Sequence, residues 1–243
     1  RDFTQNGTFD LTGKTLTFDG AADEDDTTLT LPGGTTVGGL TINKSHATGN
    51  TTLPPSPLTI LGNLIRTDGP VLPAGAYTFT VNGNVSLSTA DAWPTTTLIL
   101  AGSGNQTLTS VPSLDAVVVS KGAGTVTLGS NVTVTGDLTV SAGSTLDLNG
   151  AYTLTLNSNL VNNGTFVARA GTVALNSTSQ TLPGPLTFYN LTKTVSSAAV
   201  LTLPAGVTTT VTNSLTLQGT IGNLLSLRSS IDGTAAKLVL NSG

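Results

Sequence analysis

Apolar and polar residues alternate with a period of two along much of the chain. In the middle of the sequence the apolar residues keep to even positions, namely Val132, Val134, Leu138, Val140, Ala142, Leu146, Leu148, Tyr152, Leu154, Leu156 and Leu160. The odd positions between them are mostly Thr, Asp, Asn and Ser. Because successive side chains of a β-strand point to opposite faces, this pattern predicts strands with an apolar inner face and a hydroxyl-rich outer face.

The turns between these strands do not shift the alternation. Strands are interrupted at Gly136-Asp137, Ala142-Gly143 and Asn149-Gly150. The apolar residues nevertheless remain on even positions after each interruption. Each turn therefore returns the chain to the same core. The pattern fits a meander of hairpins, since Asn-Gly favours a two-residue turn, and it fits equally the corners of a β-solenoid.

Self-comparison reveals an internal repeat of about 75 residues. GAYTFTVNGNV at 75–85 returns as GAYTLTLNSNL at 150–160, and TTLPPSPLTILGNL at 51–64 returns twice, at 126–138 and 201–215. Upstream of each of these segments lies a strand that ends in lysine: LTINK at 40–44, VVVSK at 117–121 and YNLTK at 189–193. A fixed period is typical of stacked repeat architectures.

The predicted fold is one elongated all-β domain, 1–243, built as a β-solenoid (parallel β-helix). We place the pseudo-repeats at about 15–96, 97–171 and 172–236, with part-repeats at 1–14 and 237–243. A unit this long is expected to span about three coils of roughly 25 residues. The alternative is a set of antiparallel β-sandwich repeats of about 75 residues each. The phase kept across turns, and the absence of linkers between copies, favour the solenoid.

Both ends of the sequence look like pieces of further repeats. NGTFDLTGKTLTFDG at 6–20 matches NGTFVARAGTVALNS at 163–177, and KLVLNSG at 237–243 resembles the opening strand of another unit. Solenoids need capping at their ends, because an open coil exposes apolar core and unpaired backbone. The sequence therefore predicts either a longer array or a head-to-tail interface made by Phe9, Leu11, Leu16, Phe18, Leu238, Val239 and Leu240.

Composition removes several function classes. The chain has no Cys or Met, so disulfides and thiolate chemistry are excluded. Charged residues are only 9% and the net charge is -4, which is unlike a nucleic-acid-binding surface. No apolar run is long enough for a membrane span, and no signal peptide is visible in this numbering.

Few residues are candidates for chemistry. Asp23, Asp25 and Asp26 offer oxygen ligands for Ca²⁺, although a solvated acidic loop explains them as well; no other cofactor is expected. The single histidine, His46, has no partners for a catalytic triad or a metal site. We therefore expect no enzyme activity.

Trp93 is the only tryptophan. It is a candidate platform for stacking a sugar, with a hydrophobic plug between two repeats as the alternative.

NVTVTGDLTVSAGSTLDLNGAYTLTLNSNLVNNGTF, together with TLPGPLTFYNLTKT, resembles the repeats of large secreted bacterial surface proteins of the haemagglutinin-like and autotransporter-passenger β-helix kind. The resemblance implies export to the cell surface or the extracellular space and a structural or adhesive role. We expect a subunit that binds further copies of itself head to tail in an extracellular fibre or surface sheath. The alternative is an adhesin stalk or carbohydrate-binding module that contacts carbohydrate or a cell surface.

Overall fold

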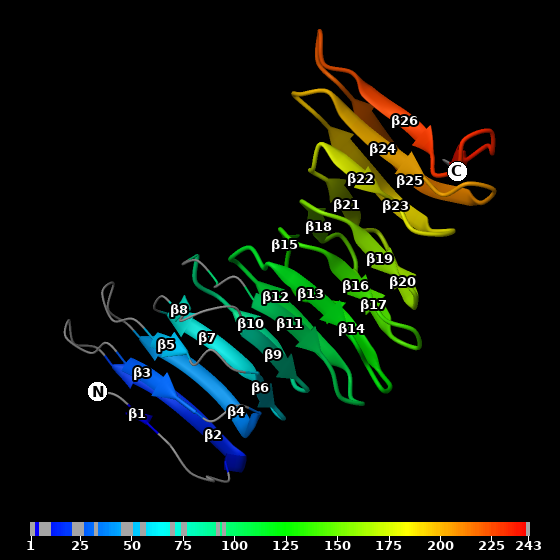
Figure 1. Cartoon of the computed structure of the whole chain (residues 1–243). Coiled ribbons are helices and arrows are strands. Elements are labelled where there is room, and N and C mark those ends of the chain that lie inside the picture. The colour runs from blue at the N-terminus through cyan, green and yellow to red at the C-terminus, as the bar shows by residue number, and fades with distance from the viewer. Residues whose placement is uncertain are drawn as a thin grey trace.

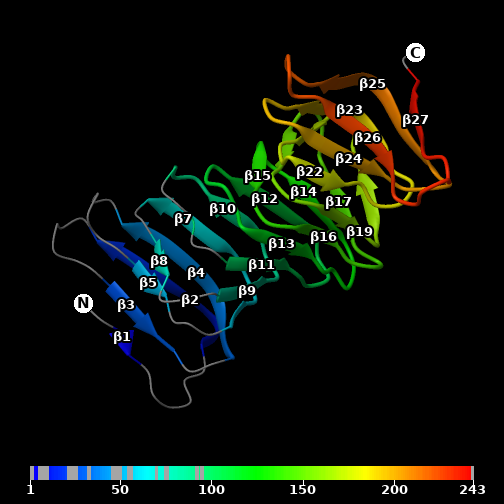
Figure 2. The same ribbon diagram turned by 45° about the horizontal axis from the view of Figure 1, so that its top comes forward.

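The chain folds as a β-solenoid, as the alternation and the repeat predict. The computed structural model describes residues 3–4, 11–20, 27–31, 34–44, 51–53, 57–68, 71–73, 77–90, 93 and 96–241. All pairings between named strands in this part of the chain are parallel, which rules out the antiparallel sandwich alternative. Figure 1 and Figure 2 show the strands stacked along one axis, with the termini at opposite ends.

Each coil passes three faces in a constant order. Face 1 consists of the first halves of β2 (Leu11–Gly20) and β4 (Thr35–Lys44), followed by β6 (Leu58–Ile60), β9 (Tyr77–Val81), β11 (Thr96–Leu100), β13 (Ala116–Val119), β16 (Leu138–Val140) and β19 (Leu160–Asn162). Face 2 consists of the second halves of β2 and β4, followed by β7 (Leu64–Asp68), β10 (Val85–Leu87), β12 (Gln106–Ser110), β14 (Thr125–Leu128), β17 (Thr145–Asp147) and β20 (Thr165–Val167).

Face 3 follows face 2 along the chain and is made by two separate groups of strands. The first group is β1 (Phe3–Thr4), β3 (Thr27–Thr30), β5 (Thr51–Leu53) and β8 (Val71–Pro73). The second is β15 (Val132–Val134), β18 (Thr153–Leu156), β21 (Thr172–Leu175) and the second halves of β23 (Thr187–Thr194) and β25 (Thr208–Gln218).

The C-terminal coils keep the same order with new strands. A separate sheet of β22 (Ser179–Thr181), β24 (Ala199–Leu203) and β26 (Leu225–Ser229) takes the place of face 1. The first halves of β23 and β25 and the last strand, β27 (Lys237–Leu240), take the place of face 2. The long strands β23 and β25 therefore turn a corner, where their register shifts.

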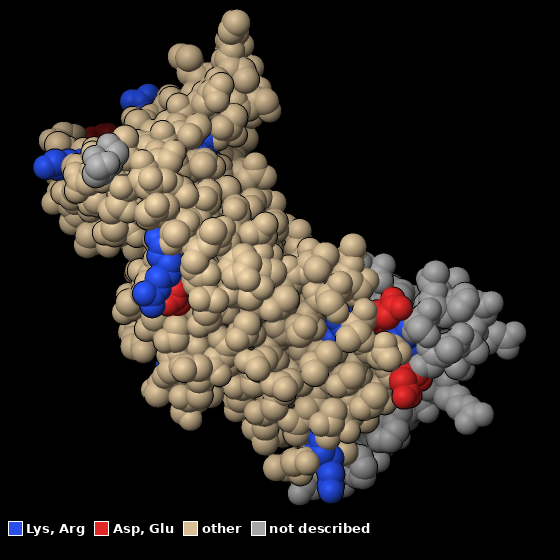
Figure 3. Space-filling view, turned by 180° about the vertical axis from the view of Figure 1, so that it is seen from behind, with Lys and Arg blue, Asp and Glu red and all other residues tan. Residues whose placement is uncertain are grey.

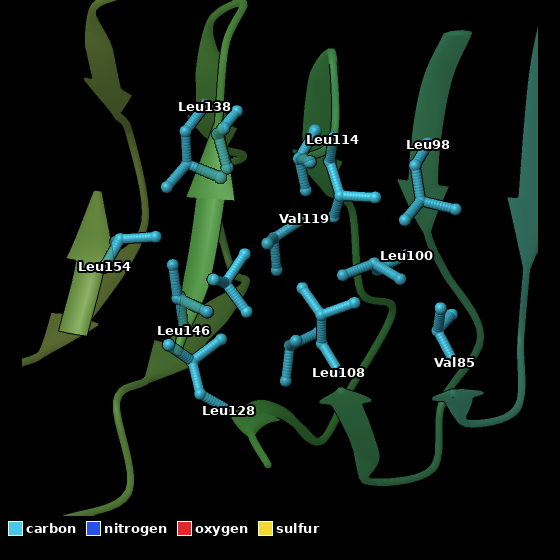
Figure 4. Packing of buried hydrophobic residues seen from close by; sticks show 14 of the residues in the cluster. Val85, Leu98, Leu100, Leu108, Leu114, Val119, Leu128, Leu138, Leu146 and Leu154 are labelled. Atoms are coloured by element: carbon cyan, nitrogen blue, oxygen red, sulfur yellow. The ribbon is translucent and has the colours of Figure 1, made fainter. Parts of the chain in front are cut away.

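Inward side chains from successive coils lie directly above one another. On face 1 the column runs through Phe79, Leu98, Val117, Leu138 and Leu160, and all of them are buried. Figure 4 shows the leucines and valines of several coils pointing into one interior. Fully burying one such side chain stabilises the fold by about 1.5–3 kcal/mol, so the core provides the main driving force for stacking.

Corner residues tie each coil to the next through their side chains. Asn63 Oδ1 accepts a hydrogen bond from the backbone N–H of Asn84, 2.8 Å away, and Asn84 Oδ1 accepts one from Thr107 at 2.8 Å. Asp137 and Asn159 repeat this arrangement one sequence repeat later, at the corner that leads into face 1. These bonds supply partners for backbone groups that the ladders leave unpaired at the turns, which explains the Asn-rich turn sequences.

The expected coil length of about 25 residues is too long for the middle of the chain, although the first coils, from β1 to β3 and from β2 to β4, advance 24 to 26 residues. The face 1 column advances 19 to 22 residues per coil from Phe79 to Leu160. Three coils take the chain from Phe79 to Leu138, and it then passes β17 on face 2 before it reaches Leu154, the repeat equivalent of Phe79, on face 3. One repeat thus advances three and two-thirds coils, not three.

A column of glycines lies at the corner between faces 1 and 2. A Cβ added to Gly62 would overlap the carbonyl of Gly38, and one added to Gly83 would overlap the carbonyl of Gly62. Gly83 N–H also donates a hydrogen bond to Gly62 O at 2.9 Å, so the two backbones cannot separate without losing it. Only glycine allows this close approach of consecutive coils.

We predict that Gly83→Ala lowers the free energy of unfolding by about 1–3 kcal/mol, because the added methyl group forces the two coils apart. Gly104→Ala is the matched control, since a Cβ there meets no atom within 4 Å. Urea unfolding followed by circular dichroism measures both variants. Equal midpoints for the two would contradict the close packing of this corner.

Candidate functional site

Six leucines of the last coil face the interior but have no coil above them among the described residues. They are Leu215 and Leu217 on face 3, Leu225 and Leu227 on the β26 sheet, and Leu238 and Leu240 on β27. We call them the C-terminal leucine face. Leu227 and Leu240 are each 47% exposed, and the other four are partly buried against the core.

The register explains why these leucines point inward. Leu227 pairs with Leu201 and Leu240 pairs with Val211, and both partners are completely buried. Leu201 and Val211 are therefore buried because the last coil covers them. Leu227 and Leu240 belong to the last coil and have a neighbouring coil on one side only. The face is the end of the hydrophobic core rather than a patch on its flank.

The edges of the same coil are also open. Among the described residues β26 pairs only with β24, and β27 pairs only with β25. Unpaired N–H and C=O groups along a strand edge are a template for a further strand. Apolar surface and open edges thus coincide at this end of the stack.

The loops of this coil add exposed apolar residues. Gly222 has a positive φ of 80° in the tight turn between β25 and β26, where Thr220 and Asn223 exchange two backbone hydrogen bonds. Ile221 in this turn is fully exposed, Leu224 directly after it is 75% exposed, and Ile231 precedes β27 on the surface.

The N-terminal strand differs from the C-terminal coil. Leu11 and Phe18 in β2 are only 7% exposed, and Leu16 is partly buried against the core. Of the residues that the sequence placed in an assembly interface, Leu240 has the most exposed apolar surface, while Leu238 and Val239 are half-buried. Phe9 lies outside the described residues.

Two of the lysines at the common repeat position form buried pairs with glutamine. Lys121 Nζ donates to Gln106 Oε1 at 2.7 Å and to the carbonyl of Ala101 at 2.6 Å. Gln106 Nε2 in turn donates to the carbonyls of Val81 and Gly83. The pair therefore ties three successive coils together from the inside.

The same arrangement recurs one repeat later. Lys193 Nζ donates to Gln180 Oε1 at 2.8 Å, and Gln180 Nε2 donates to the carbonyls of Leu156 and Ser158. Burial lowers the pKa of both Lys121 and Lys193 below the ordinary value for lysine. Since both lysines donate to amide and carbonyl oxygens, we assign the pairs a structural role.

Trp93 lies inside the stack. Its ring is 7% exposed and packs on Phe79, with 5.7 Å between ring centroids, while the guanidinium of Arg66 lies 5.4 Å from its centre. Its indole Nε1 donates to Thr96 Oγ1 at 3.1 Å. This is the arrangement expected of a hydrophobic plug rather than of a surface platform.

An ion pair links two coils near the middle of the chain. Arg169 Nε and a terminal guanidinium nitrogen bind Asp147 at 3.0 and 2.9 Å. Burial alone would raise the pKa of Asp147, but hydrogen bonds from Arg169 and from the backbone of Asn149 outweigh it and lower the pKa. The side chain of Arg169 is 60% exposed, so the pair lies at the surface.

The predicted metal ligands Asp23, Asp25 and Asp26 lie outside the described residues, and so does His46. Among the residues that the structure describes, no group of three or more His, Cys, Asp or Glu side chains could hold a metal ion. In the same part of the chain no helix could cross a membrane.

No protein-family model, curated protein or solved structure matches the chain.

We predict that Lys121→Met lowers the free energy of unfolding by about 1–3 kcal/mol, because it leaves Gln106 Oε1 and the Ala101 carbonyl buried without a donor. Lys237→Met, at an exposed lysine of β27, should change it by less than about 0.5 kcal/mol. Urea midpoints compare the two variants. A Lys121→Met protein as stable as the parent would remove the structural role of the pair.

The Asp147 pair predicts a pH dependence. Because its pKa is lowered in the folded protein, its contribution is present above the ordinary carboxyl pKa and is lost as pH falls through the lower folded value. The stability difference between the parent and Asp147→Asn should therefore shrink as pH falls from about 6 to about 2.5. Urea unfolding across this range measures it, and a constant difference would contradict the assignment.

Proposed function

We propose that this protein is a secreted structural subunit that assembles head to tail into an extracellular fibre or surface sheath. The observation that carries the proposal is the C-terminal leucine face, where the core of the stack meets solvent beside the open edges of β26 and β27. A further coil placed there buries apolar side chains and pairs backbone groups in one step.

A second copy is a suitable supplier of that coil. All coils stack in parallel, so a copy added at the C-terminal end has its chain running in the same direction as the strands it covers. Such a contact joins two different ends and does not close on itself, which gives an open filament rather than a ring. The mode is β-augmentation, in which a strand extends an exposed sheet edge.

The distribution of charge favours opposite ends meeting. Seven of the 13 acidic residues lie within residues 1–26, which contain only two basic residues. The last coil exposes Arg228 and Lys237, with Asp232 as the acidic residue near them. Figure 3 shows acidic side chains together with basic ones near the N-terminal region, and mainly basic side chains towards the opposite end. This excess of acidic residues early in the sequence and of basic residues in the last coil favours a contact between unlike ends.

The interior supports a load-bearing role. The buried Lys121–Gln106 and Lys193–Gln180 pairs tie coils together without disulfides, which the chain cannot form. Parallel ladders that run along the axis distribute a pull over many backbone hydrogen bonds. The resemblance to secreted bacterial surface repeats supports placing this shaft outside the cell.

The test is a pair of substitutions at the C-terminal leucine face. Leu227→Lys with Leu240→Lys places two charges on the end of the core, and we expect filaments of the parent in negative-stain electron microscopy and only single rods of this variant. The matched control is Val111→Lys with Val161→Lys, at residues 58% and 38% exposed on the flank of the shaft. We expect filaments from the control.

Two results would contradict the proposal. The parent chain would remain as single short rods at every concentration, or the leucine variant would form filaments as readily as the flank control. Sedimentation velocity over the same concentration series measures the size distribution independently of adsorption to a grid.

A further inference from the structure

The repeat rotates around the axis from one copy to the next. Leu160 ends the string GAYTLTLNSNL, Val85 ends GAYTFTVNGNV, and Phe3 stands three residues before NGTF as Leu160 does. These three equivalent residues lie on different faces: Phe3 in β1 on face 3, Val85 in β10 on face 2, and Leu160 in β19 on face 1. Each repeat therefore steps back by one face.

Three repeats restore the starting face. Since one repeat advances three and two-thirds coils, three repeats advance eleven whole coils. The next residue equivalent to Phe3, Val85 and Leu160 would be one repeat after Leu160. It would lie on face 3 again, which is the face of β1. A stack of three repeats can thus be extended by another stack without any rotation about the axis.

A further coil added to the last one would place its strands in the order of the faces along the chain. β27 lies on face 2, so the next strand in the coil order belongs on face 3, over the second half of β25. The strands after it belong over β26 and then over β27. The N-terminal strands of this chain occur in that order: β1 on face 3, the first half of β2 on face 1 and the second half on face 2.

We propose that a second copy docks in this rotational register, with β1 over the second half of β25 and β2 over β26 and β27. The inference rests on the proposed function and specifies its interface. It places Leu11 of one copy above Leu225 and Leu227 of the other, because Leu11 pairs inward with Val37 on face 1.

On face 2 the inward and outward residues of β2 correspond one to one with those of β27. Leu16 and Phe18 pair with the buried residues Leu40 and Ile42, so both point inward, as Leu238 and Leu240 do. Between each pair lies an outward residue, Thr17 in β2 and Val239 in β27. In the proposed register Thr17 of one copy is the direct neighbour of Val239 of the next, at a strand spacing of about 4.8 Å.

Cysteine cross-linking tests the register directly, because the chain contains no native cysteine. The same-face variant carries Thr17→Cys and Val239→Cys. The off-face control carries Thr17→Cys and Arg228→Cys, since Arg228 pairs with Thr202 on the β26 sheet and points outward there. Both variants keep the C-terminal leucine face, and each places one cysteine at either end of the stack.

After mild oxidation and non-reducing electrophoresis, the same-face variant should form covalent dimers and higher multiples. The off-face control should form no more disulfide-linked dimers than a chain that carries only one of the two cysteines. Filaments that give equal cross-linking in both variants, or more in the off-face control, would overturn the register while leaving the proposed function standing. Absence of filaments from the parent chain would overturn the proposed function itself.

Discussion

The parallel register between successive coils is the constraint on which the other features of this protein depend. It aligns inward residues such as Phe79, Leu98 and Val117 into a continuous column, and the backbone ladder holds that column at a fixed spacing. One coil lies directly on another, and this explains two local features. Gly62 and Gly83 allow the close approach of consecutive backbones, and Asn84 bonds to the next coil through its side chain. A slip of one residue would turn every apolar side chain outward.

In this register the sequence repeat does not correspond to a whole number of coils. Because the repeat advances three and two-thirds coils, Lys121 follows a strand of face 1 whereas Lys193 lies in a strand of face 3, although they occupy one repeat position. Equivalent positions of successive repeats therefore do not stack on one another, and each Lys–Gln pair ties a different corner of the shaft. A repeat that advanced whole coils would concentrate these pairs along one side.

Strand content, the inner face and the solenoid followed from the sequence, because period-two alternation and repeats are local signals that survive in a single chain. The coil length did not, since Gly and Asn turns fix corners but not how many corners close a coil. The lysines at 44, 121 and 193 were visible as a repeat, yet their burial was not. Gln106 and Gln180, in GNQTL and STSQTL, are the sequence feature that could have revealed this burial. Trp93 is buried beside Arg66 of the preceding coil, and a contact between coils cannot be read from the local sequence.

The measurement that tests this account most directly is a pulsed electron spin resonance distance between labels at Thr59 and Thr139. These two outward positions belong to one column, connected through Thr80, Ile99 and Val118 over four strand steps. The register predicts a narrow distribution centred at about 19 Å between the two backbone positions. A broad distribution, or a distance beyond about 30 Å, would contradict the stacked parallel register and every conclusion drawn from it.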